Sequence, residues 1–582
     1  MATTTNRVVV DPVTRIEGHL RVEAMLTNGV VTDAISSGTM WRGIELILQG
    51  RDPREAWAFC QRICGVCTTV HAVASVRAVE NALGISVPPN ADIIRNMMFL
   101  AQFLQDHVVH FYHLHALDWV DLVSALKANP PATAALQSTV SRAWPNSSPA
   151  YFADVQAKVK RFVESGQLGI FGNAYWGHSA YKLPPEGNLL AVAHYFEALQ
   201  WQKEIVKIHA LFGGKNPHPS YLVGGMASVL NPSGDEHALN MNRLNSIGGL
   251  IQDAINLVEG MYLPDLQLLA TFYPEWSRIG GGLGNFMAYG DLPQNGIGNP
   301  SGFRFPQGAL LIDKDGKLGE PLPLDLADPS QITEEVGHSW YSYPGGSKPA
   351  LHPSDGVTSP GYAGPAPPFE RLDENGKYSW VKAPRWRGKA MEVGPLARVL
   401  VGYASKRPDF QDVVREALFG LGWSESQLIS TMGRTLARGL ETRLCARWLK
   451  AEYEALMANV RRGVLATADS SKWDPATWKR TPALGFGFTE APRGACAHWI
   501  RIGSDKKIAN YQIVVPSTWN ASPKDGAGKK GAYESALLGT PLADSAKPLE
   551  ILRTIHSFDP CLACATHVVS NDGRTLAEVV VR

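Results

Sequence analysis

Several features are missing or scarce in this chain, and each absence excludes a class of protein. Seven cysteines in 582 residues, odd in number and gathered toward the two ends, do not form a disulfide framework. Lysine plus arginine (55) balance aspartate plus glutamate (54), so no cationic surface for nucleic acid is predicted. No uncharged apolar run reaches the roughly 18 to 20 residues that cross a bilayer, and the first fifteen residues have no apolar signal core. We therefore expect a folded protein in which metal binding is the first role to consider for the cysteines, and in which any export would depend on a partner.

The composition favours a large packed core, with 45% hydrophobic and 19% charged residues. Alternating residues predict strands at Arg7 to Val10 and His19 to Leu26, joined by a turn at Thr27-Asn28-Gly29. Segments with helical periodicity are 92–128, 189–212, 239–272 and 424–463. The Gly- and Pro-rich segment 273–387 predicts loops and short strands on a helical core. We expect one α+β domain over 1–582, predominantly α-helical, with long central helices and small peripheral sheets.

Two Cys-x-x-Cys pairs stand near opposite ends of the chain: Cys64 and Cys67, and Cys561 and Cys564. This spacing lets two thiolates converge on one metal from a tight turn. A local zinc module usually has its two pairs within a few tens of residues, whereas almost the whole chain separates these. Spacing alone leaves three interpretations open: one four-sulfur site, two unrelated metal or redox pairs, or reduced structural cysteines.

The motifs around these pairs add a resemblance. They are Asp11-Pro-Val-Thr-Arg-Ile-Glu17-Gly-His19, Arg42-Gly-Ile-Glu45, Arg62-Ile-Cys-Gly-Val-Cys67-Thr-Thr-Val-His71, Glu490-Ala-Pro-Arg493-Gly, Val515-Pro-Ser517-Thr-Trp-Asn520 and Asp559-Pro-Cys-Leu-Ala-Cys-Ala-Thr-His567. In order along the chain, they resemble the large subunit of nickel-iron hydrogenases, most closely the respiratory uptake type. The resemblance implies the fold of this large subunit. It also implies reversible, heterolytic oxidation of H₂ to two protons and two electrons.

The same resemblance implies a ligand set. Cys64 and Cys561 would be terminal nickel ligands, and Cys67 and Cys564 would bridge nickel to an iron that also carries carbon monoxide and cyanide. Soft thiolates suit nickel in a redox role. Cys561 would also be the first proton acceptor, and Glu17 would pass the proton outward. An isolated glutamate would instead be read as an exposed or salt-bridged carboxylate.

The resemblance places further residues around this centre. Arg493 would lie over the open metal position, with Asp106 and Asp559 as its carboxylate partners. Alternatively, Asp106 could pair with His110, which follows it by four residues on the same predicted helix. The remaining surrounding residues would be His71, Pro492, Ser517 and Pro560, with His71 bonding a bridging sulfur and Ser517 a cyanide.

A second metal and a removable tail are also implied. Glu45, the main-chain carbonyl near Ile513, and His567 would hold a magnesium or iron ion. Residues 568–582 would be a maturation tail. Other proteins would insert nickel, and a dedicated protease would then remove the tail and leave a mature chain of 1–567. The alternative interpretation of this segment is an ordinary terminal strand.

The resemblance finally implies partners and a location. Electrons would leave through a small subunit with iron-sulfur clusters toward a membrane acceptor. Export with that subunit would place the chain at the periplasmic face of the inner membrane; a cytoplasmic enzyme of the same family is the alternative. Outside enzymes, a non-catalytic H₂ sensor and a structural four-cysteine zinc protein remain. Cys60, Cys445 and Cys496 are expected to be buried thiols, and the histidines at 107, 110, 113 and 115 packed, hydrogen-bonded residues.

Overall fold

The computed structural model describes residues 5–142, 144–235, 237–313, 316–344, 346, 350–365, 371–479 and 481–565. Its α-helices are α1 Ile44–Ile47, α2 Ala56–Gln61, α3 Val70–Leu83, α4 Pro89–Val109, α5 Leu122–Ala125, α6 Pro130–Val140, α7 Pro149–Glu164, α8 Pro185–Ile205, α9 Lys207–Gly213, α10 Met241–Leu257, α11 Leu263–Phe272, α12 Pro395–Ala404, α13 Pro408–Leu421, α14 Thr431–Arg461, α15 Pro516–Asn520, α16 Ala532–Leu537, α17 Leu549–Ser557 and α18 Leu562–Ala565. Its strands are β1 Thr5–Val10, β2 Leu20–Thr27, β3 Val30–Gly38, β4 Asn285–Ala288, β5 Asp291–Pro293, β6 Phe303–Phe305, β7 Gly308–Leu311, β8 Ile332–Glu335, β9 Ala383–Trp386, β10 Ala483–Ala491, β11 Gly494–Ile502 and β12 Ile508–Val514.

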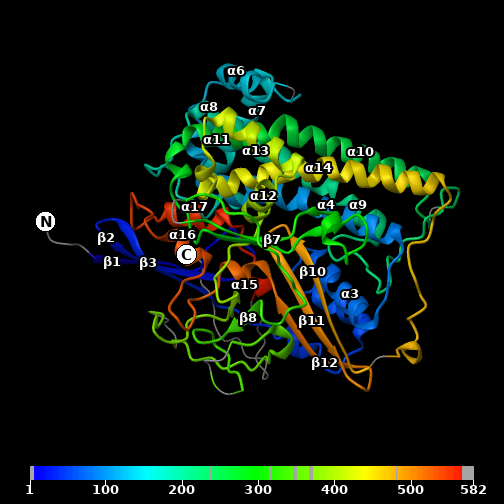
Figure 1. Ribbon diagram of the computed structural model, residues 1–582. Helices are drawn as coiled ribbons and strands as arrows, with labels where there is room; N and C mark the ends of the chain where they lie inside the picture. The colour runs from blue at the N-terminus through cyan, green and yellow to red at the C-terminus, as the bar shows by residue number, and fades with distance from the viewer. Residues whose placement is uncertain are drawn as a thin grey trace.

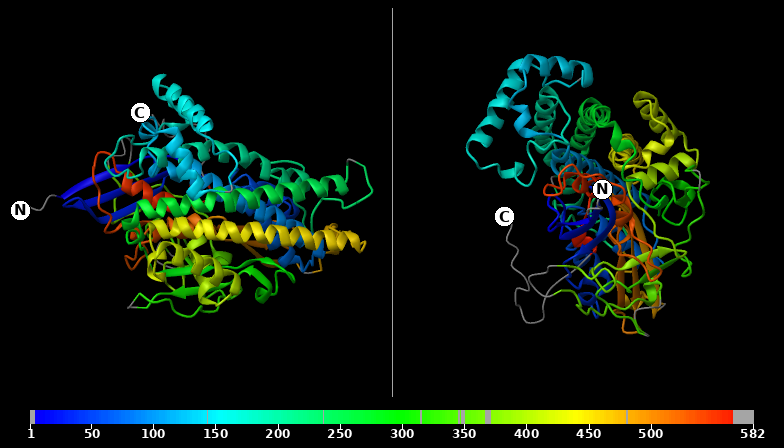
Figure 2. Two further views of the ribbon diagram at one scale, coloured as in Figure 1. Left: turned by 90° about the horizontal axis from the view of Figure 1, so that it is seen from above. Right: turned by 90° about the vertical axis from the view of Figure 1, so that its left-hand side faces the viewer.

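Long helices form one layer of the molecule and small sheets lie below them, as expected for the predicted α+β class (Figure 1). The longest helix, α14, packs along α4 and α10, and Figure 2 shows α10 and α14 running side by side. Gly439 permits the close packing of α14 on α11, because a Cβ there would meet Leu266 Cδ1 at 2.2 Å. None of the helices in the described ranges is long and apolar enough to cross a membrane.

The two predicted N-terminal strands are confirmed as β1 and β2, but the turn at 27–29 joins β2 to a third strand and does not join the two predicted strands to each other. β1, β2 and β3 pair in sequence order, all antiparallel. Asn28 and Gly29 both have positive φ, 52° and 79°, as a two-residue turn between β2 and β3 requires. The third strand was not predicted because its residues, VVTDAISSG, do not alternate strictly between apolar and polar.

The predicted single helix over 92–128 is wrong in its second half. After α4 the backbone widens into a π-helix at His110–His115, tightens into a 3₁₀ turn and stops before Leu122. Polar partners from distant elements explain the change, because His110 Nε2 lies 2.5 Å from His556 O and His115 Nε2 3.0 Å from Thr435 Oγ1. A regular helix would turn these histidines toward other neighbours.

The sheet β10-β11-β12 lies directly against α3 and brings two motifs together. Gly485 and Gly487 on β10 make this approach possible: a Cβ at Gly487 would meet Ala74 O at 2.1 Å. Cys64 and Cys67 precede α3, and Arg493 occupies the turn between β10 and β11. Packing of α3 on β10 therefore carries the first cysteine pair toward the arginine motif.

The C-terminal segment crosses the molecule to reach the N-terminal strands. Cys561 forms a parallel bridge with Glu17: Glu17 N–H donates to Pro560 O (3.2 Å) and Leu562 N–H donates to Glu17 O (2.7 Å). Gly18 has φ of 82°, and a Cβ there would meet Ala563 N at 2.3 Å. Only glycine fits between Glu17 and His19, so the two ends of the described chain lie in direct contact.

Candidate metal centre

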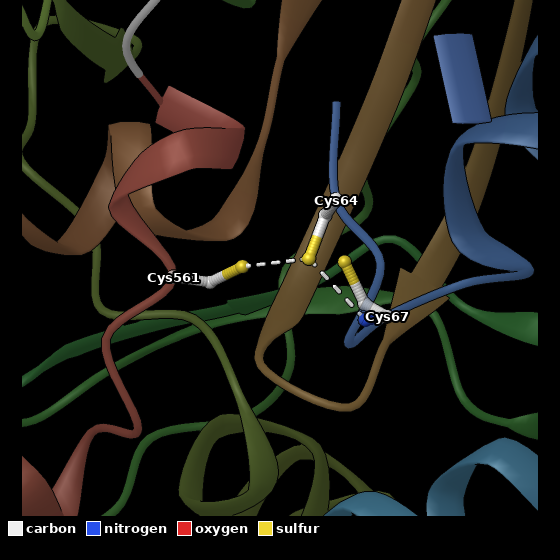
Figure 3. A group of neighbouring side chains, drawn as sticks. All are labelled: Cys64, Cys67 and Cys561. Carbon is white, nitrogen blue, oxygen red and sulfur yellow. Dashed lines mark hydrogen bonds between the residues drawn. The ribbon is translucent and has the colours of Figure 1, made fainter. Parts of the chain in front are cut away.

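Three cysteine sulfurs converge at a buried point between the N- and C-terminal segments (Figure 3). The Sγ atoms of Cys64, Cys67 and Cys561 all lie within 4.8 Å of one another, and those of Cys64 and Cys561 are 3.4 Å apart. Cys67 N–H also points at Cys64 Sγ (3.3 Å). Buried thiolates this close repel one another unless a cation lies among them, so the donor set fits a soft metal ion.

The fourth predicted sulfur lies outside what can be described here. The backbone of Cys564 belongs to α18, one helical turn beyond Cys561, but its side chain is not among the described ones. The predictions for His567 and for the tail 568–582 also fall outside the described residues. The structure thus brings together three of the four predicted sulfur ligands.

Glu17 is the carboxylate nearest the sulfurs among the described residues. Cys561 Sγ lies 3.2 Å from Glu17 Oε2, and the same oxygen accepts Ala563 N–H at 3.0 Å. Burial raises the pKa of Glu17 to about 7, and the neighbouring Cys64 sulfur adds to the shift. A thiol and a carboxyl group with a pKa near neutrality, in direct contact, can exchange a proton at physiological pH.

Arg493 is held over the cluster by two carboxylates. Its Nη1 donates to Asp106 Oδ2 (2.9 Å), and its Nη2 and Nε donate to Oδ1 and the main-chain O of Asp559 (both 3.1 Å). All three residues are buried. Burial opposes the charge of Arg493, but Asp559 and Asp106 hold its pKa well above the usual range. The alternative pairing of Asp106 with His110 is not formed, because His110 Nε2 bonds to His556 O. The second partner of Asp106 is Gln102, whose Nε2 lies 2.5 Å from Asp106 Oδ1.

The remaining predicted neighbours have defined partners. Ser517 Oγ accepts Cys561 N–H at 3.0 Å, so it fixes the backbone of that cysteine. Pro492 O accepts Arg398 Nη2–H at 2.9 Å. His71 Nδ1 lies 3.1 Å from His498 Nε2. Burial lowers the pKa of His71 to about 4. A neutral His71 is what a hydrogen-bonding neighbour of a metal site requires.

A second candidate site surrounds Glu45. Ile513 N–H donates to Glu45 Oε1 (2.9 Å) and Thr358 donates to Oε2, so Glu45 lies beside the main chain of Ile513 with the N–H, rather than the predicted carbonyl, in contact with it. The pocket there is also lined by Glu334 and Lys382, whose Nζ lies 3.5 Å from Glu334 Oε2 and 3.9 Å from Glu45 Oε2. Burial raises the pKa of Glu334 to about 7.

Sequence reasoning missed several residues around both sites. Glu334 and Lys382 lie in the segment without periodicity, where nothing marked them. Arg438 lies on the core face of α14, with its Nη1 3.6 Å from Asp559 Oδ2. A charged residue on an apolar helical stripe was the signal that could have found Arg438. Arg42 stands in the Arg42-Gly-Ile-Glu45 motif, in which only Glu45 was predicted to have a role.

The other cysteines and histidines are packed as expected. Cys60, Cys445 and Cys496 are buried, and burial raises the pKa of Cys60 to about 12, with its Sγ 3.5 Å from Tyr511 Oη. His107 Nε2 lies 2.8 Å from Glu441 Oε1, and His113 Nε2 lies 3.2 Å from Tyr195 O. Each of these side chains thus has a packing or hydrogen-bonding role within the core.

Comparisons with known proteins agree with the geometry. Residues 42–567 match the family model described as nickel-dependent hydrogenase. The chain is 56% identical to the uptake hydrogenase large subunit of Rhizobium leguminosarum bv. viciae and 51% identical to the hydrogenase-1 large chain of Escherichia coli K12, with 99% of this chain and 97% of each relative covered. A solved structure of the Ni-Fe-Se hydrogenase of Desulfovibrio vulgaris Hildenborough superimposes with a TM-score of 0.76 at 34% identity, covering 97% of this chain and 100% of the other.

Proposed function

The chain belongs to the nickel-dependent hydrogenase family as a large, catalytic subunit that oxidises H₂, and from this premise we propose that the reaction takes place at Cys64, Cys67 and Cys561, with Glu17 carrying the proton. The observation that carries this proposal is the contact of a carboxyl group with one sulfur of a three-sulfur cluster. Cys64 and Cys561 would be terminal nickel ligands, and Cys67 and Cys564 would bridge nickel and iron.

A nickel-iron centre held by these sulfurs supplies the acceptor for the electrons of H₂. The chain's own residues then handle the protons. Cys561 Sγ receives the two protons of H₂ one after the other, and Glu17 Oε2 takes each across 3.2 Å and releases it toward solvent. The Ala563 N–H bond to the same carboxylate oxygen keeps Glu17 aimed at the sulfur throughout.

Arg493 would keep a fixed positive charge beside the site and exclude water from it. Its two carboxylate partners come from different elements, α4 and the segment after α17, so the guanidinium cannot rotate away without breaking both ion pairs. In the proposed centre, Arg493 and Ser517 would be the hydrogen-bond donors for the cyanide ligands of the iron, and a carbon monoxide would complete that iron's diatomic ligands.

Replacing one sulfur tests this assignment. Cys561→Ser should abolish H₂ oxidation, because a serine oxygen is a harder ligand and a poorer proton acceptor than a thiolate. Cys445→Ser is the matched control: it also changes a buried cysteine, but on α14 away from the sulfur cluster. H₂ oxidation by the Cys561→Ser enzyme at the rate of the Cys445→Ser enzyme would contradict the proposal.

The Glu45 pocket would hold a magnesium or iron ion with the main chain of Ile513 and His567. Support comes from a buried carboxylate beside a main-chain group, with Glu334 and Lys382 placed to bind the ion's water ligands. Glu45→Gln should lower the magnesium or iron content by one ion per chain while nickel stays. An unchanged content of both ions in that variant would remove Glu45 from the site.

A large subunit implies a small subunit as its partner, and we propose that this partner carries iron-sulfur clusters and accepts the electrons. The apolar side chains of Leu46 and Ile47 on α1 and of Val66 between the first two cysteines are more than a third exposed close to the site and suit such an interface. Ile47→Asp should reduce co-purification of the small subunit, whereas Phe419→Asp, on exposed α13, should not. Equal recovery from both variants would place the interface elsewhere.

Maturation and location complete the proposal. Nickel-insertion proteins and a protease would act on the chain, the protease after His567, and export with the small subunit would bring the enzyme to the periplasmic face of the inner membrane, where a membrane acceptor takes the electrons. The mass of the purified chain tests processing, since removal of residues 568–582 predicts His567 as the last residue. Fractionation of intact cells, with H₂ oxidation measured in the cytoplasm, periplasm and membrane, tests location.

A further inference from the structure

Arg42 joins the two metal-binding segments through their main chains. It lies in the loop between β3 and α1, followed by Gly43, which has φ of 68°. Its Nη2 donates both to Ile63 O and to Ala563 O (2.7 Å), and its Nη1 donates to Arg62 O (3.2 Å). One guanidinium nitrogen thus links the residue before Cys64 with the residue before Cys564.

The position of this link differs from that of the contacts made by Glu17 and Arg493. Glu17 holds the C-terminal segment to the N-terminal strands, through Leu562 N–H and Ala563 N–H. Arg493 holds Asp559 on another side, through its side chain and carbonyl. Arg42 is the side chain among the described residues that bonds the backbones of both Cys-x-x-Cys motifs at once.

The chemistry of arginine explains why this residue suits the task. Its planar guanidinium presents several donors in fixed directions, so three carbonyl oxygens from two segments can be bound together. Its charge is permanent and lies close to a group of thiolates, whose negative charge it partly offsets. A lysine in the same place keeps the charge but cannot reproduce the fork.

We propose that Arg42 is a positioning residue that clamps the two cysteine segments together and so slows the loss of nickel from the site. This inference rests on the proposed function, because it assumes that the sulfurs hold nickel. The clamp acts on the geometry of the ligand set and takes no part in proton transfer. Its removal should therefore affect metal retention even where no H₂ is present.

The test measures nickel release from the purified two-subunit enzyme into a chelator such as EDTA. The Arg42→Gln enzyme should lose nickel at least tenfold faster than the unmodified enzyme. The Arg42→Lys enzyme should lose nickel at a rate between these two. Arg407→Gln is the matched control, because Arg407 also donates to a main-chain carbonyl, Phe303 O, at 2.6 Å, but outside the site. Release from Arg42→Gln at the rate of this control overturns the proposal.

A second measurement separates the clamp from a general loss of stability. Arg42→Ala leaves space for a guanidinium ion, so millimolar guanidinium should slow nickel release from this variant and leave the Arg407→Gln control unchanged. Failure of that rescue in a variant with the circular dichroism spectrum of the unmodified enzyme overturns the proposal. If the Arg42→Gln enzyme does not fold, the nickel release rate of the Arg42→Lys enzyme is the test. Nickel retention by that variant equal to that of the unmodified enzyme overturns the proposal. An unmodified enzyme without nickel would contradict the proposed function itself.

Discussion

Replacing Glu17 by glutamine removes one proton carrier and changes little else. The glutamine oxygen can still accept Ala563 N–H, and the side chain has the same length, so the backbone pairing of Glu17 with Cys561 should persist. An amide cannot take and release a proton near neutral pH. Among the described residues, the other two carboxylates near the cluster, Asp106 and Asp559, are bound to Arg493, whereas Glu17 contacts the Cys561 sulfur directly.

The expected effect follows from the contact that is lost. A positioned general acid or base contributes about 10²- to 10⁴-fold to the rate. The 3.2 Å contact of Cys561 Sγ with Glu17 Oε2 is already at hydrogen-bond distance, so the full effect applies. We therefore expect the H₂ oxidation rate to fall at least 100-fold, which corresponds to about 3 kcal/mol of barrier.

Two measurements on the same preparation separate this account from simple damage. H₂ oxidation with an artificial electron acceptor should drop, while nickel and iron per chain stay at the level of the unmodified enzyme. Glu452→Gln is the control: Glu452 is a buried glutamate on the distant part of α14, where its Oε1 lies 2.7 Å from Arg304 Nε. H₂ oxidation by the fully loaded Glu17→Gln enzyme within twofold of the unmodified rate would refute the role of Glu17.

Two further predictions concern charge. Arg493→Lys should lower kcat/KM for H₂ about 10- to 100-fold, because a single ammonium cannot hold Asp106 and Asp559 with separate nitrogens, and an unchanged kcat/KM would show that the double anchor is not needed. Burial raises the pKa of Glu534 to about 7, so its protonated form contributes stability that is complete below pH 4.5 and is lost as the pH rises to about 7. Glu534→Gln should therefore raise stability relative to the unmodified chain by about 3 kcal/mol at pH 8, and by almost nothing at pH 4.5. Parallel melting curves at both pH values check this, and an equal difference at the two would contradict it.

The sequence was most informative where chemistry and local pattern coincide. Cysteines 64, 67 and 561 could be assigned to one site from motifs, although they lie at opposite ends of the chain, and the structure brings their sulfurs within 4.8 Å. The long helix predicted over 424–463 is α14, Thr431–Arg461; the predicted start forms instead a separate 3₁₀ turn at Glu425–Leu428. Asp106 was harder, since a partner four residues away on the same helix was an equally good local explanation.

The features that could not be predicted from the sequence depend on contacts between distant segments. The break after α4 arises from bonds of His110 and His115 to elements hundreds of residues away. Glu334 and Lys382 reach the Glu45 pocket from a stretch with no period, so no spacing predicts their approach. Arg42 is equally invisible, because its role lies in main-chain carbonyls, which every residue has.

The central claim is that the sulfurs of Cys64, Cys67 and Cys561, completed by Cys564, hold a nickel-iron centre. The most direct test is the nickel, iron and zinc content per chain of the enzyme purified from its native host, where maturation takes place. We expect nickel near one per chain, together with iron and without zinc. One zinc per chain and no nickel would contradict it and favour a structural four-sulfur site.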